Sequence, residues 1–392
     1  MQLFDFNKHI DRRNSGSVKW DMTKEFFGTD EVLPMWVADM DFEAPPEVIA
    51  ALQTRITHGV YGYSAAGQSA RESVAGWMKT RHSWEIDPEW IVFSPGVVSS
   101  ISMAIQAYTN PGDTVVVQPP VYTPFFDMTK ENGRKIAENP LLLKNGVYDI
   151  DFDNLEQKLS HPEAKLFLLC SPHNPGGRVW TAAELSRIGK LCIQHDVILI
   201  SDEIHSDLLL FGKKHTPAAS LSDSIADICI TFAAPSKTFN LAGLQASEAI
   251  IKKKELRTAF SAVQHKNGIF TLNAAGAAAL ESAYTYGAKW LDSLLVHLQQ
   301  NVLFAEKYLT SRIPALTLVK PHSTYLLWID CRALKSSDAE IKRALLKNGL
   351  ALESGEKFGA EGRGFVRMNI GCSLTTLKEG LKRLENAVSN LS

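Results

Sequence analysis

Short apolar runs that alternate with helix-like segments restrict the fold of this chain more than any other feature. They lie in EWIVFSPG (89–96), TVVVQPP (114–120), AKLFLLCSPHNP (164–175), VILISDE (197–203) and ICITFAAPSK (228–237). Because the runs are continuously apolar, they fit strands buried on both faces. Amphipathic stretches such as AAELSRIGKLCIQHD (182–196) lie between them and fit covering helices. The sequence therefore predicts an α/β fold with a mostly parallel sheet sandwiched by helices.

The length of the chain, 392 residues, exceeds what one hydrophobic core usually organises, so we expect two domains. The pattern changes near residue 286, where one long helical stretch (274–313) leads into strand-like and glycine-rich segments. We predict a large domain over 47–285 and a smaller α+β C-terminal domain over 286–392. Residues 1–46 are expected to form an N-terminal arm or part of the small domain.

Charge and cysteine content narrow the class of protein. With 41 basic and 43 acidic residues, the formal net charge of −2 offers no general attraction to nucleic acid or to an anionic membrane. The five cysteines form no C-x-x-C pair, so we expect reduced thiols in a cytoplasmic protein. The N-terminal sequence MQLFDFNKHIDRRNSG lacks the apolar segment of a secretory signal, and no apolar run approaches the length of a membrane span.

Distinct chemical groups follow four of the apolar runs. Gly96-Val97-Val98 opens a helix after the first run, Asn174 follows the third, Asp202 the fourth and Lys237 the fifth. Ligands of open α/β sheets bind beyond the carboxyl ends of the strands, so these groups are expected to converge on one edge. Each group also has an ordinary explanation when it is taken alone. Gly96 can simply form a turn, Asn174 can begin an Asn-Pro turn, and Asp202 can cap a helix. Lys237 can be a surface lysine.

Taken together, the four groups match the handles of one cofactor. A lysine amine condenses with an aldehyde, a carboxylate keeps a pyridine nitrogen protonated, and free amides at a helix start hold a phosphate. Aldehyde, pyridine and phosphate are the groups of pyridoxal 5′-phosphate. The sequence therefore predicts a pyridoxal-phosphate site.

The same residues carry a family resemblance that extends over nearly the whole chain. In order and spacing, Asn174-Pro175, Asp202 and Lys237 resemble the fold-type I pyridoxal-phosphate enzymes of the aminotransferase class I/II superfamily. More narrowly, the chain resembles the MalY/PatB group of carbon–sulfur β-lyases in LPMWVADMDF (33–42), VYGY (60–63), SPHNPGGRVW (171–180), SDEIHSDL (201–208) and SKTFNLAGL (236–244). This resemblance implies the fold-type I architecture, a homodimer with shared active sites and a small-molecule sulfur amino acid as substrate.

The resemblance also assigns cofactor contacts. Lys237 matches the lysine that bonds covalently to the cofactor aldehyde, and Asp202 matches the partner of the pyridine nitrogen. Asn174 matches the residue that binds the 3-hydroxyl oxygen and lies beside the substrate, and the ring of Tyr122 matches the one that stacks on the cofactor. The phosphate-binding turn corresponds to Gly96, Val97 and Val98.

Further positions concern the substrate and the second subunit. Tyr61 matches a tyrosine given to the cofactor phosphate of the neighbouring subunit, and with Lys237 and Tyr122 it completes the expected catalytic set. Arg367 matches the arginine that clamps the substrate's α-carboxylate, a bidentate task suited to guanidinium. Trp36 lies in a segment typical of the lyase group; we expect it to pack an N-terminal arm at the site entrance, beside the substrate.

Two departures from the family concern the phosphate. Many relatives carry Ser three residues before the lysine and Arg eight after it, where this chain has Ala234 and Gln245. Ser236, Tyr61 and the backbone amides are then expected to carry more of the phosphate binding. The segment around Lys237 also lacks acidic residues, which predicts a lowered lysine pKa and a more nucleophilic amine.

The segment DEIHSD (202–207) can also be interpreted as a metal cluster. No matching His/Cys partner occurs elsewhere in the sequence, so we expect no metal site. His205 is instead expected near Asp202 and the cofactor, with a purely structural histidine as the alternative.

The resemblance implies α,β-elimination of L-cystathionine, with L-cysteine or other S-substituted cysteines as further candidates. The products are pyruvate, ammonia and a thiol such as homocysteine. An aminotransferase uses the same lysine, aspartate and arginine and remains an alternative. A regulatory protein that acts by binding another protein is a third hypothesis of a different class.

Overall fold

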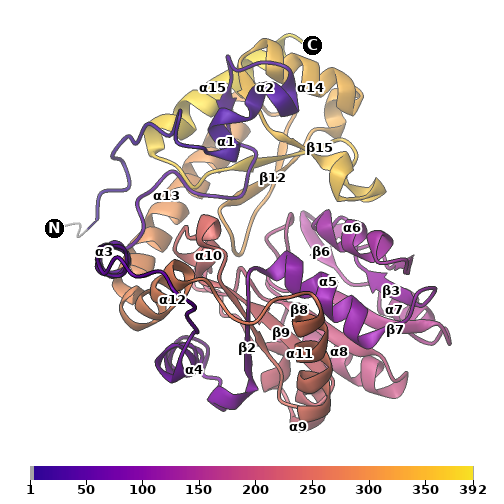
Figure 1. Ribbon diagram of the computed structural model, residues 1–392. Coiled ribbons are helices and arrows are strands. Elements are labelled where there is room, and N and C mark those ends of the chain that lie inside the picture. Colours follow the sequence, from indigo (N-terminus) through magenta and orange to yellow (C-terminus); the bar gives the residue numbers. More distant parts are fainter. Residues whose placement is uncertain (1–3, 392) are drawn as a thin grey trace.

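The computed structural model describes residues 4–391 and contains two main sheets, each flanked by helices (Figure 1). The larger sheet has seven strands in the order β2-β10-β9-β8-β7-β3-β4. Their bounds are β2 (Ile91–Ser94), β3 (Thr114–Val117), β4 (Lys135–Glu138), β7 (Ala164–Cys170), β8 (Ile198–Asp202), β9 (Cys229–Ala233) and β10 (Ser247–Ile250). Strand β10 pairs antiparallel with β2 and β9, and the remaining pairs of this sheet are parallel. All five apolar runs are strands of this sheet, which confirms the predicted α/β class.

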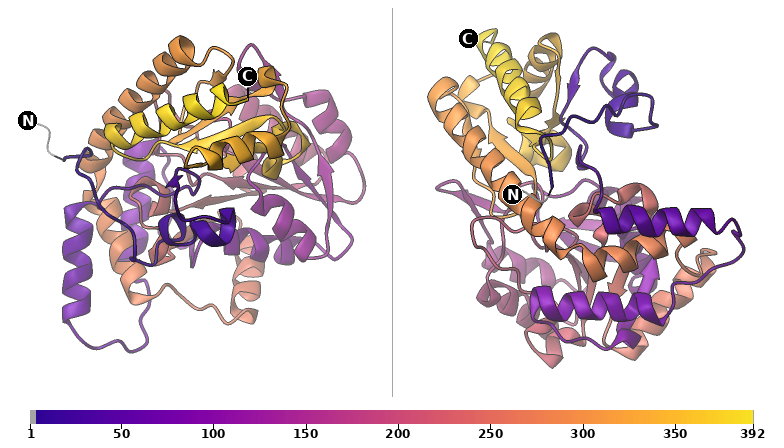
Figure 2. Two further views of the ribbon diagram at one scale, coloured as in Figure 1. Left: turned by 90° about the horizontal axis from the view of Figure 1, so that it is seen from above. Right: turned by 90° about the vertical axis from the view of Figure 1, so that its left-hand side faces the viewer.

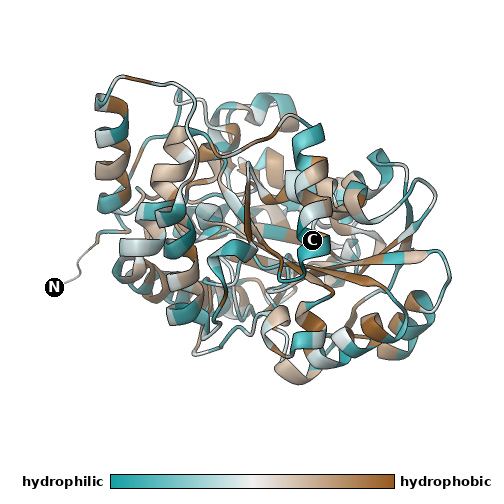
Figure 3. Cartoon of the chain, turned by 60° about the horizontal axis from the view of Figure 1, so that its bottom comes forward, coloured by the Kyte–Doolittle hydropathy of each residue, from teal (hydrophilic) through white to brown (hydrophobic). Residues whose placement is uncertain are grey.

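Central strands of this sheet are buried on both faces. In β7, Leu166 and Leu168 pack into one hydrophobic cluster, whereas Phe167 and Leu169 pack into the other. One face is covered by α5 (Val97–Tyr108), α6 (Pro124–Glu131) and α11 (Lys254–Lys266). The opposite face is covered by α4 (Gln68–His82), α7 (Phe152–Leu159), α8 (Ala182–Gln194) and α12 (Ala274–Tyr286). Figure 3 shows hydrophobic strands inside and hydrophilic residues on the outer turns of the helices.

The smaller sheet is antiparallel and takes its strands from the last third of the chain. Its order is β11-β12-β15-β14, with β11 (Thr317–Val319), β12 (Leu326–Asp330), β15 (Phe365–Asn369) and β14 (Glu353–Ser354). The accompanying helices are α13 (Ala288–Arg312), α14 (Asp338–Lys347) and α15 (Leu374–Ser389). This arrangement agrees with the α+β pattern predicted for the C-terminal part, while the domain limits at 46/47 and 285/286 stay predictions.

The N-terminal segment lies against the smaller sheet rather than beside the segment that follows it in sequence (Figure 2). Strand β1 (Leu33–Pro34) pairs in parallel with β13 (Leu350–Ala351), far along the chain. The short helices α1 (Val18–Asp21) and α2 (Thr23–Phe27) precede it, and α3 (Pro46–Thr57) follows on the larger unit. Remaining elements are the hairpin β5 (Leu142–Lys144) and β6 (Val147–Asp149), and the short helices α9 (Asp223–Ala226) and α10 (Pro235–Thr238).

The single long helix expected over 274–313 is instead two helices, α12 and α13. They meet at Gly287, which packs closely against a neighbouring ring. A Cβ at this position would lie 2.4 Å from Cε1 of Phe239 and 2.6 Å from the carbonyl oxygen of Ala283. The glycine therefore allows a close contact at the break that no other residue permits without a shift. Within residues 4–391, no helix is long and apolar enough to cross a membrane.

Candidate active site

A cavity of about 300 Å³ lies at the carboxyl edge of the central strands. Strands β7, β8 and β9 end there, and α5 begins there after β2. Every predicted site residue except Tyr61 lines this cavity: Trp36, Gly96, Val97, Val98, Tyr122, Asn174, Asp202, His205, Ser236, Lys237 and Arg367. The structure thus brings together groups that are distant in sequence, as the rule for strand ends predicts.

Lys237 is the only amine among the described residues that line the cavity. It sits on α10, the short helix that follows β9, and its Nζ donates a hydrogen bond of 2.7 Å to the carbonyl oxygen of Ala38. Burial lowers the pKa of Lys237 to about 8, although the negative charge of Asp39 opposes this shift. The direction is the one expected from the uncharged segment around the lysine. With this pKa, roughly a tenth of the amine is neutral, and nucleophilic, at pH 7, far more than for an ordinary lysine.

Asp202 is a buried carboxyl group that has no directly paired cation within residues 4–391. It ends β8, and its Oδ1 accepts a hydrogen bond of 3.2 Å from the backbone amide of Ile204. Burial raises the pKa of Asp202 to about 7. A cationic ring nitrogen beside this carboxyl would favour its charged form, which is what a protonated pyridine supplies.

Arg367 reaches the cavity from β15 of the smaller sheet. Nη1 donates to Oδ1 of Asn174 at 3.1 Å, and Nη2 donates to the carbonyl oxygen of Trp36 at 2.9 Å. Its Nε is buried and has no hydrogen-bond partner within the described chain. The guanidinium carbon lies 5.0 Å from the centre of the Phe358 ring, which fixes the plane of the group. An unpaired donor on a buried guanidinium marks a place for an anionic ligand such as a carboxylate.

Trp36 contributes its main chain to this arrangement, while its side chain packs within the N-terminal arm. The indole Nε1 donates to the carbonyl oxygen of Lys19 at 3.1 Å. Its ring centroid lies 4.8 Å from that of Phe26 and 5.1 Å from that of Phe27. These contacts agree with the expected packing of an arm at the site entrance.

Tyr122 and His205 line the cavity in their neutral forms. Burial raises the pKa of Tyr122 to about 12, and burial lowers the pKa of His205 to about 3. Nδ1 of His205 is buried without a hydrogen-bond partner in the described residues, and the imidazole lies edge-on to Tyr325, with centroids 6.4 Å apart. A neutral imidazole placed here can accept or donate a hydrogen bond without adding charge near Asp202.

The start of α5 is suited to an anion. Gly96 precedes the helix with φ of 157° and ψ of 155°, and no side chain of the described part of the chain caps the amides that follow. Those amides belong to Val97 and Val98, which line the cavity together with Ser236 and Gln245. Uncapped amides at a helix N-terminus bind phosphate oxygens well. By contrast, Ala234 is buried and lies outside the cavity lining, so the missing hydroxyl at that position is not replaced there.

Tyr61 is the one predicted site residue that the single chain does not bring to the cavity. It lies in the loop between α3 and α4 and is 64% exposed. Its hydroxyl donates to the carbonyl oxygen of Ile56, and Arg55 lies over its ring with the guanidinium carbon 5.8 Å from the centroid. The role proposed for this tyrosine needs a second subunit, so its position in one chain neither supports nor opposes it.

Other cavity residues were missed at the sequence level. The carbonyl of Ala38 holds the lysine, but a main-chain oxygen leaves no signature in a side-chain pattern. Glu353 belongs to the two-residue strand β14, which is too short to show a periodicity. Its only sequence signal is its position before the glycine-rich segment.

The acidic residues near Asp202 take part in a network of hydrogen bonds with histidine and threonine side chains. Glu203 accepts from Nε2 of His215 at 2.7 Å, and Asp207 contacts Nε2 of His82 at 2.8 Å and accepts from Thr238 Oγ1 at 2.8 Å. Among residues 4–391, no group of three or more His, Cys, Asp or Glu side chains is arranged to hold a metal ion. Asp207 thereby anchors the residue that follows Lys237.

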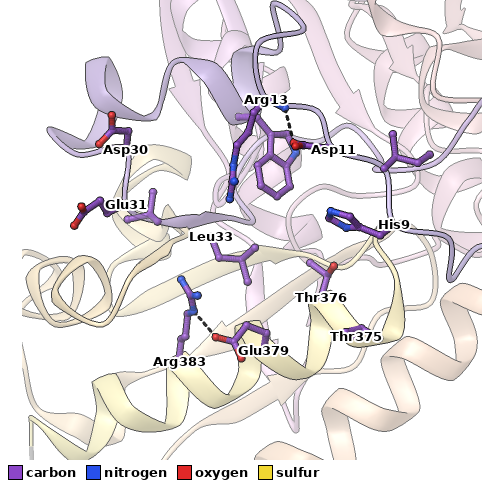
Figure 4. Close-up of a pocket in the computed structure, with 13 residues that line it drawn as sticks. His9, Asp11, Arg13, Asp30, Glu31, Leu33, Thr375, Thr376, Glu379 and Arg383 are labelled. Atoms are coloured by element: carbon purple, nitrogen blue, oxygen red, sulfur yellow. Dashed lines mark hydrogen bonds and ion pairs between the residues drawn. The ribbon is translucent and has the colours of Figure 1, made fainter.

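A second cavity, of about 420 Å³, lies between the N-terminal arm and α15 (Figure 4). It is lined by charged groups that include Arg13, Glu31 and Arg383, and Nε of Arg383 pairs with Oε1 of Glu379 at 2.8 Å. Its lining, as far as the structure describes it, contains no lysine. The chemistry predicted for the chain is therefore possible in the first cavity and not in the second.

Comparison with known proteins agrees with this geometry. Residues 30–384 match the family described as aminotransferase class I and II. The chain belongs to this family. It is 53% identical to cystathionine β-lyase PatB of Bacillus subtilis over 386 residues, which cover 98% of this chain and 100% of that protein. It is also 35% identical to protein MalY of Escherichia coli over 389 residues, which cover 98% and 99% of the two chains.

Solved structures of family members superpose closely on the chain. Cystalysin from Treponema denticola, whose crystal structure contains pyridoxal 5′-phosphate, is 38% identical and has a TM-score of 0.96 over 100% of both chains. A pyridoxal-phosphate-bound C–S lyase from Staphylococcus hominis is 31% identical and has a TM-score of 0.92 over 98% of each chain. These likenesses confirm the predicted resemblance to the MalY/PatB group and the fold-type I architecture.

Proposed function

We propose that the protein is a pyridoxal-phosphate-dependent carbon–sulfur β-lyase that converts L-cystathionine to pyruvate, ammonia and homocysteine. The observation that carries the proposal is one cavity in which Lys237, Asp202 and Arg367 converge. Family membership adds that a relative of nearly equal length, 53% identical, is a cystathionine β-lyase.

The residues of the cavity fit the cofactor. Among the residues that the structure describes, Asp202 has no directly paired cation and the amides at the start of α5 have no side-chain cap. Lys237 has a lowered pKa. These three features correspond to the pyridine nitrogen, the phosphate and the aldehyde of pyridoxal phosphate, and Asn174 and Tyr122 would contact the ring. When bound, the cofactor supplies a carbonyl that condenses with amines and a ring that takes up the electron pair released from the substrate's Cα.

The chain's own residues then orient the substrate and move its proton. Arg367 has a free Nε for the α-carboxylate and is held in place by Asn174 and the Trp36 carbonyl. Lys237, in its neutral form, is the base that removes the α-proton, and a pKa near the working pH suits this task. Since the β-thiolate is a good leaving group, its departure can follow proton removal. Tyr122 remains protonated beside the reacting atoms because its pKa is raised to about 12.

A homodimer with shared active sites is part of the proposal. Large apolar side chains around Tyr61 are exposed in the single chain: Ile56, Val60, Tyr63, Phe270 and Tyr286. A groove of about 810 Å³ between α3 and α12 lies on the same side, lined by residues of both helices. Such a surface is suited to a second copy of the chain. Tyr61 would then reach the phosphate of the partner's cofactor.

We also propose a cytoplasmic location, with the substrate and the second subunit as partners and with neither nucleic acid nor a membrane. The support is that all five cysteines are buried free thiols, which suits a reducing compartment.

The test uses the cofactor-loaded protein and two reactions. Incubation with L-cystathionine should release pyruvate and a free thiol. Incubation with an amino acid and 2-oxoglutarate should give little glutamate. Glutamate formation without pyruvate would favour the aminotransferase activity for which the family is described.

A further inference from the structure

Glu353 lines the active-site cavity together with Arg367. In the antiparallel pair of β14 and β15, Glu353 is the direct partner of Arg367. Side chains of directly opposed residues in such a pair lie on the same face of the sheet and close together. The two charges affect the pKa of Arg367. Burial lowers this pKa, and the negative charge of Glu353 is the largest effect that opposes the shift.

Lys357 forms a charge pair with Glu353, the member of the pair that lines the cavity. Its Nζ lies 2.7 Å from Oε1 of Glu353, and the lysine side chain is 49% exposed whereas that of Glu353 is 13% exposed. Within residues 4–391, the Glu353 carboxylate has no further hydrogen bond or ion pair, so its second oxygen is available to a ligand. A pair whose lysine is half-exposed contributes little to stability. Stability therefore does not explain why Glu353 lies in the cavity lining.

The main chain around Lys357 is fixed to the segment that carries Tyr122. Thr123 Oγ1 donates to the carbonyl oxygen of Lys357 at 2.8 Å, and the amide of Val121 donates to the carbonyl oxygen of Phe358 at 2.8 Å. Both neighbours of Tyr122 in sequence therefore hold the turn of Lys357 and Phe358. The charge pair is thus anchored next to the cavity and does not belong to a free surface loop.

L-cystathionine differs from simple S-alkyl cysteines at the end that does not react. One end provides the α-carboxylate and Cα, and the thioether links it to a second amino acid with its own ammonium and carboxylate. The reacting end can be held by Arg367 in any S-substituted cysteine. Discrimination in favour of L-cystathionine therefore requires groups that recognise a zwitterion beyond the sulfur.

We propose that Glu353 and Lys357 bind the far amino-acid end of L-cystathionine, with Glu353 contacting the ammonium and Lys357 the carboxylate. This inference rests on the proposed lyase function and names the residues that select its substrate. The pair has the same two opposite charges as the zwitterion, so each charge of the ligand can face its opposite.

The experiment measures kcat/KM of the cofactor-loaded protein by pyruvate release with three substrates. L-Cystathionine has both distal charges, S-(3-carboxypropyl)-L-cysteine lacks the distal ammonium, and S-ethyl-L-cysteine lacks the whole distal amino acid. Glu353→Gln should lower kcat/KM for L-cystathionine roughly five- to twentyfold, as for a partly exposed charged contact, and leave that for S-ethyl-L-cysteine within about twofold. The variant should also lose the parent's preference for L-cystathionine over the carboxypropyl compound. Lys357→Gln should lower kcat/KM for L-cystathionine and leave kcat/KM for S-ethyl-L-cysteine unchanged.

Glu356→Gln is the matched control, because it removes the same charge from an exposed neighbour that does not line the cavity. It should behave as the parent with all three substrates. Calorimetry can also measure the affinity of the Lys237→Ala variant for L-cystathionine. This affinity should fall by a similar factor in the double variant that also carries Glu353→Gln. An equal loss with L-cystathionine and S-ethyl-L-cysteine, or no loss with either, would overturn the proposal. If the parent releases pyruvate from none of the three substrates, the lyase function itself fails.

Discussion

Replacement of Arg367 separates a substrate clamp from a structural arginine. The guanidinium holds Asn174 and the Trp36 carbonyl through Nη1 and Nη2, and its Nε is unpaired within the described chain. Arg367→Ala removes the clamp and also leaves two buried acceptors without a donor. A fall in melting temperature is therefore expected from either role, and melting temperature alone does not discriminate between them.

The expected kinetic effect follows from the contacts. A carboxylate placed against Nε and one Nη would form two charge-assisted hydrogen bonds, each worth about 1.5–3 kcal/mol. Water that solvates the carboxylate in the variant offsets part of this energy, so we expect a loss of about 2–4 kcal/mol in kcat/KM, or roughly thirty- to a thousandfold. Arg367→Lys keeps the charge but cannot present a planar fork, so it should recover only part of this loss.

The assay compares S-ethyl-L-cysteine with its α-carboxamide, because neither has a distal amino acid. The parent should strongly prefer the free acid, and Arg367→Ala should reduce that preference by about the same factor as it reduces kcat/KM. Arg363→Ala, at an exposed arginine near the same strand, serves as the control and should change neither value. If Arg367→Ala prefers the acid over the amide as strongly as the parent does, the clamp assignment is wrong.

Three further predictions concern the cofactor. Asp202→Asn should weaken cofactor retention yet raise the melting temperature of the cofactor-free protein. Because the pKa of Asp202 is raised, ionisation of its carboxyl group destabilises the fold as pH rises through about 7. The gain in melting temperature from Asp202→Asn should therefore be large at about pH 8 and smaller at about pH 5. A variant that melts at a lower temperature than the parent at pH 8 would contradict this. The rate of cofactor capture by the cofactor-free protein should rise with pH and be half-maximal near pH 8, since only the neutral Lys237 amine reacts; a rise that continues to about pH 10.5 would show an ordinary lysine. Tyr61→Phe should weaken cofactor retention by about 1–2 kcal/mol, measured by dialysis and absorbance. Light scattering should show a dimer, and a fully active monomer would refute the shared site.

Much of the larger sheet could be predicted because its strands are continuously apolar. Strands β4 and β10 could not, since KIAE and SEAI are mixed in polarity. In β10, Glu248 is fully buried, and burial raises its pKa to about 8. Its carboxyl group accepts a hydrogen bond from the hydroxyl of Tyr284, a tertiary contact that no local pattern predicts. The break between α12 and α13 was missed for the same reason, because it depends on how closely Gly287 approaches Phe239.

The candidate site shows the same division. Asn174, Asp202 and Lys237 could be placed together because each lies at or just after the carboxyl end of one of three parallel strands in one sheet. Glu353 could not, since it arrives through a two-residue strand of the other sheet. Tyr61 marks a different limit: its expected contact lies in a second molecule.

The contact between Lys237 and the Ala38 carbonyl has a consequence for how the protein is made. The segment that contains Ala38 leaves the ribosome early, whereas its partners come much later: the hydroxyl of Tyr325 donates to the same carbonyl, and Asn369 donates to the carbonyls of Val37 and Asp39. Synthesis proceeds from the N-terminus at about 5–20 residues per second. Several seconds or longer therefore pass between the synthesis of this segment and that of the residues that hydrogen-bond to it. A nascent chain that is halted before β15 would contain Lys237 but would lack the part of the site that β15 provides. Cofactor capture during translation should thus report that nearly the whole polypeptide has emerged.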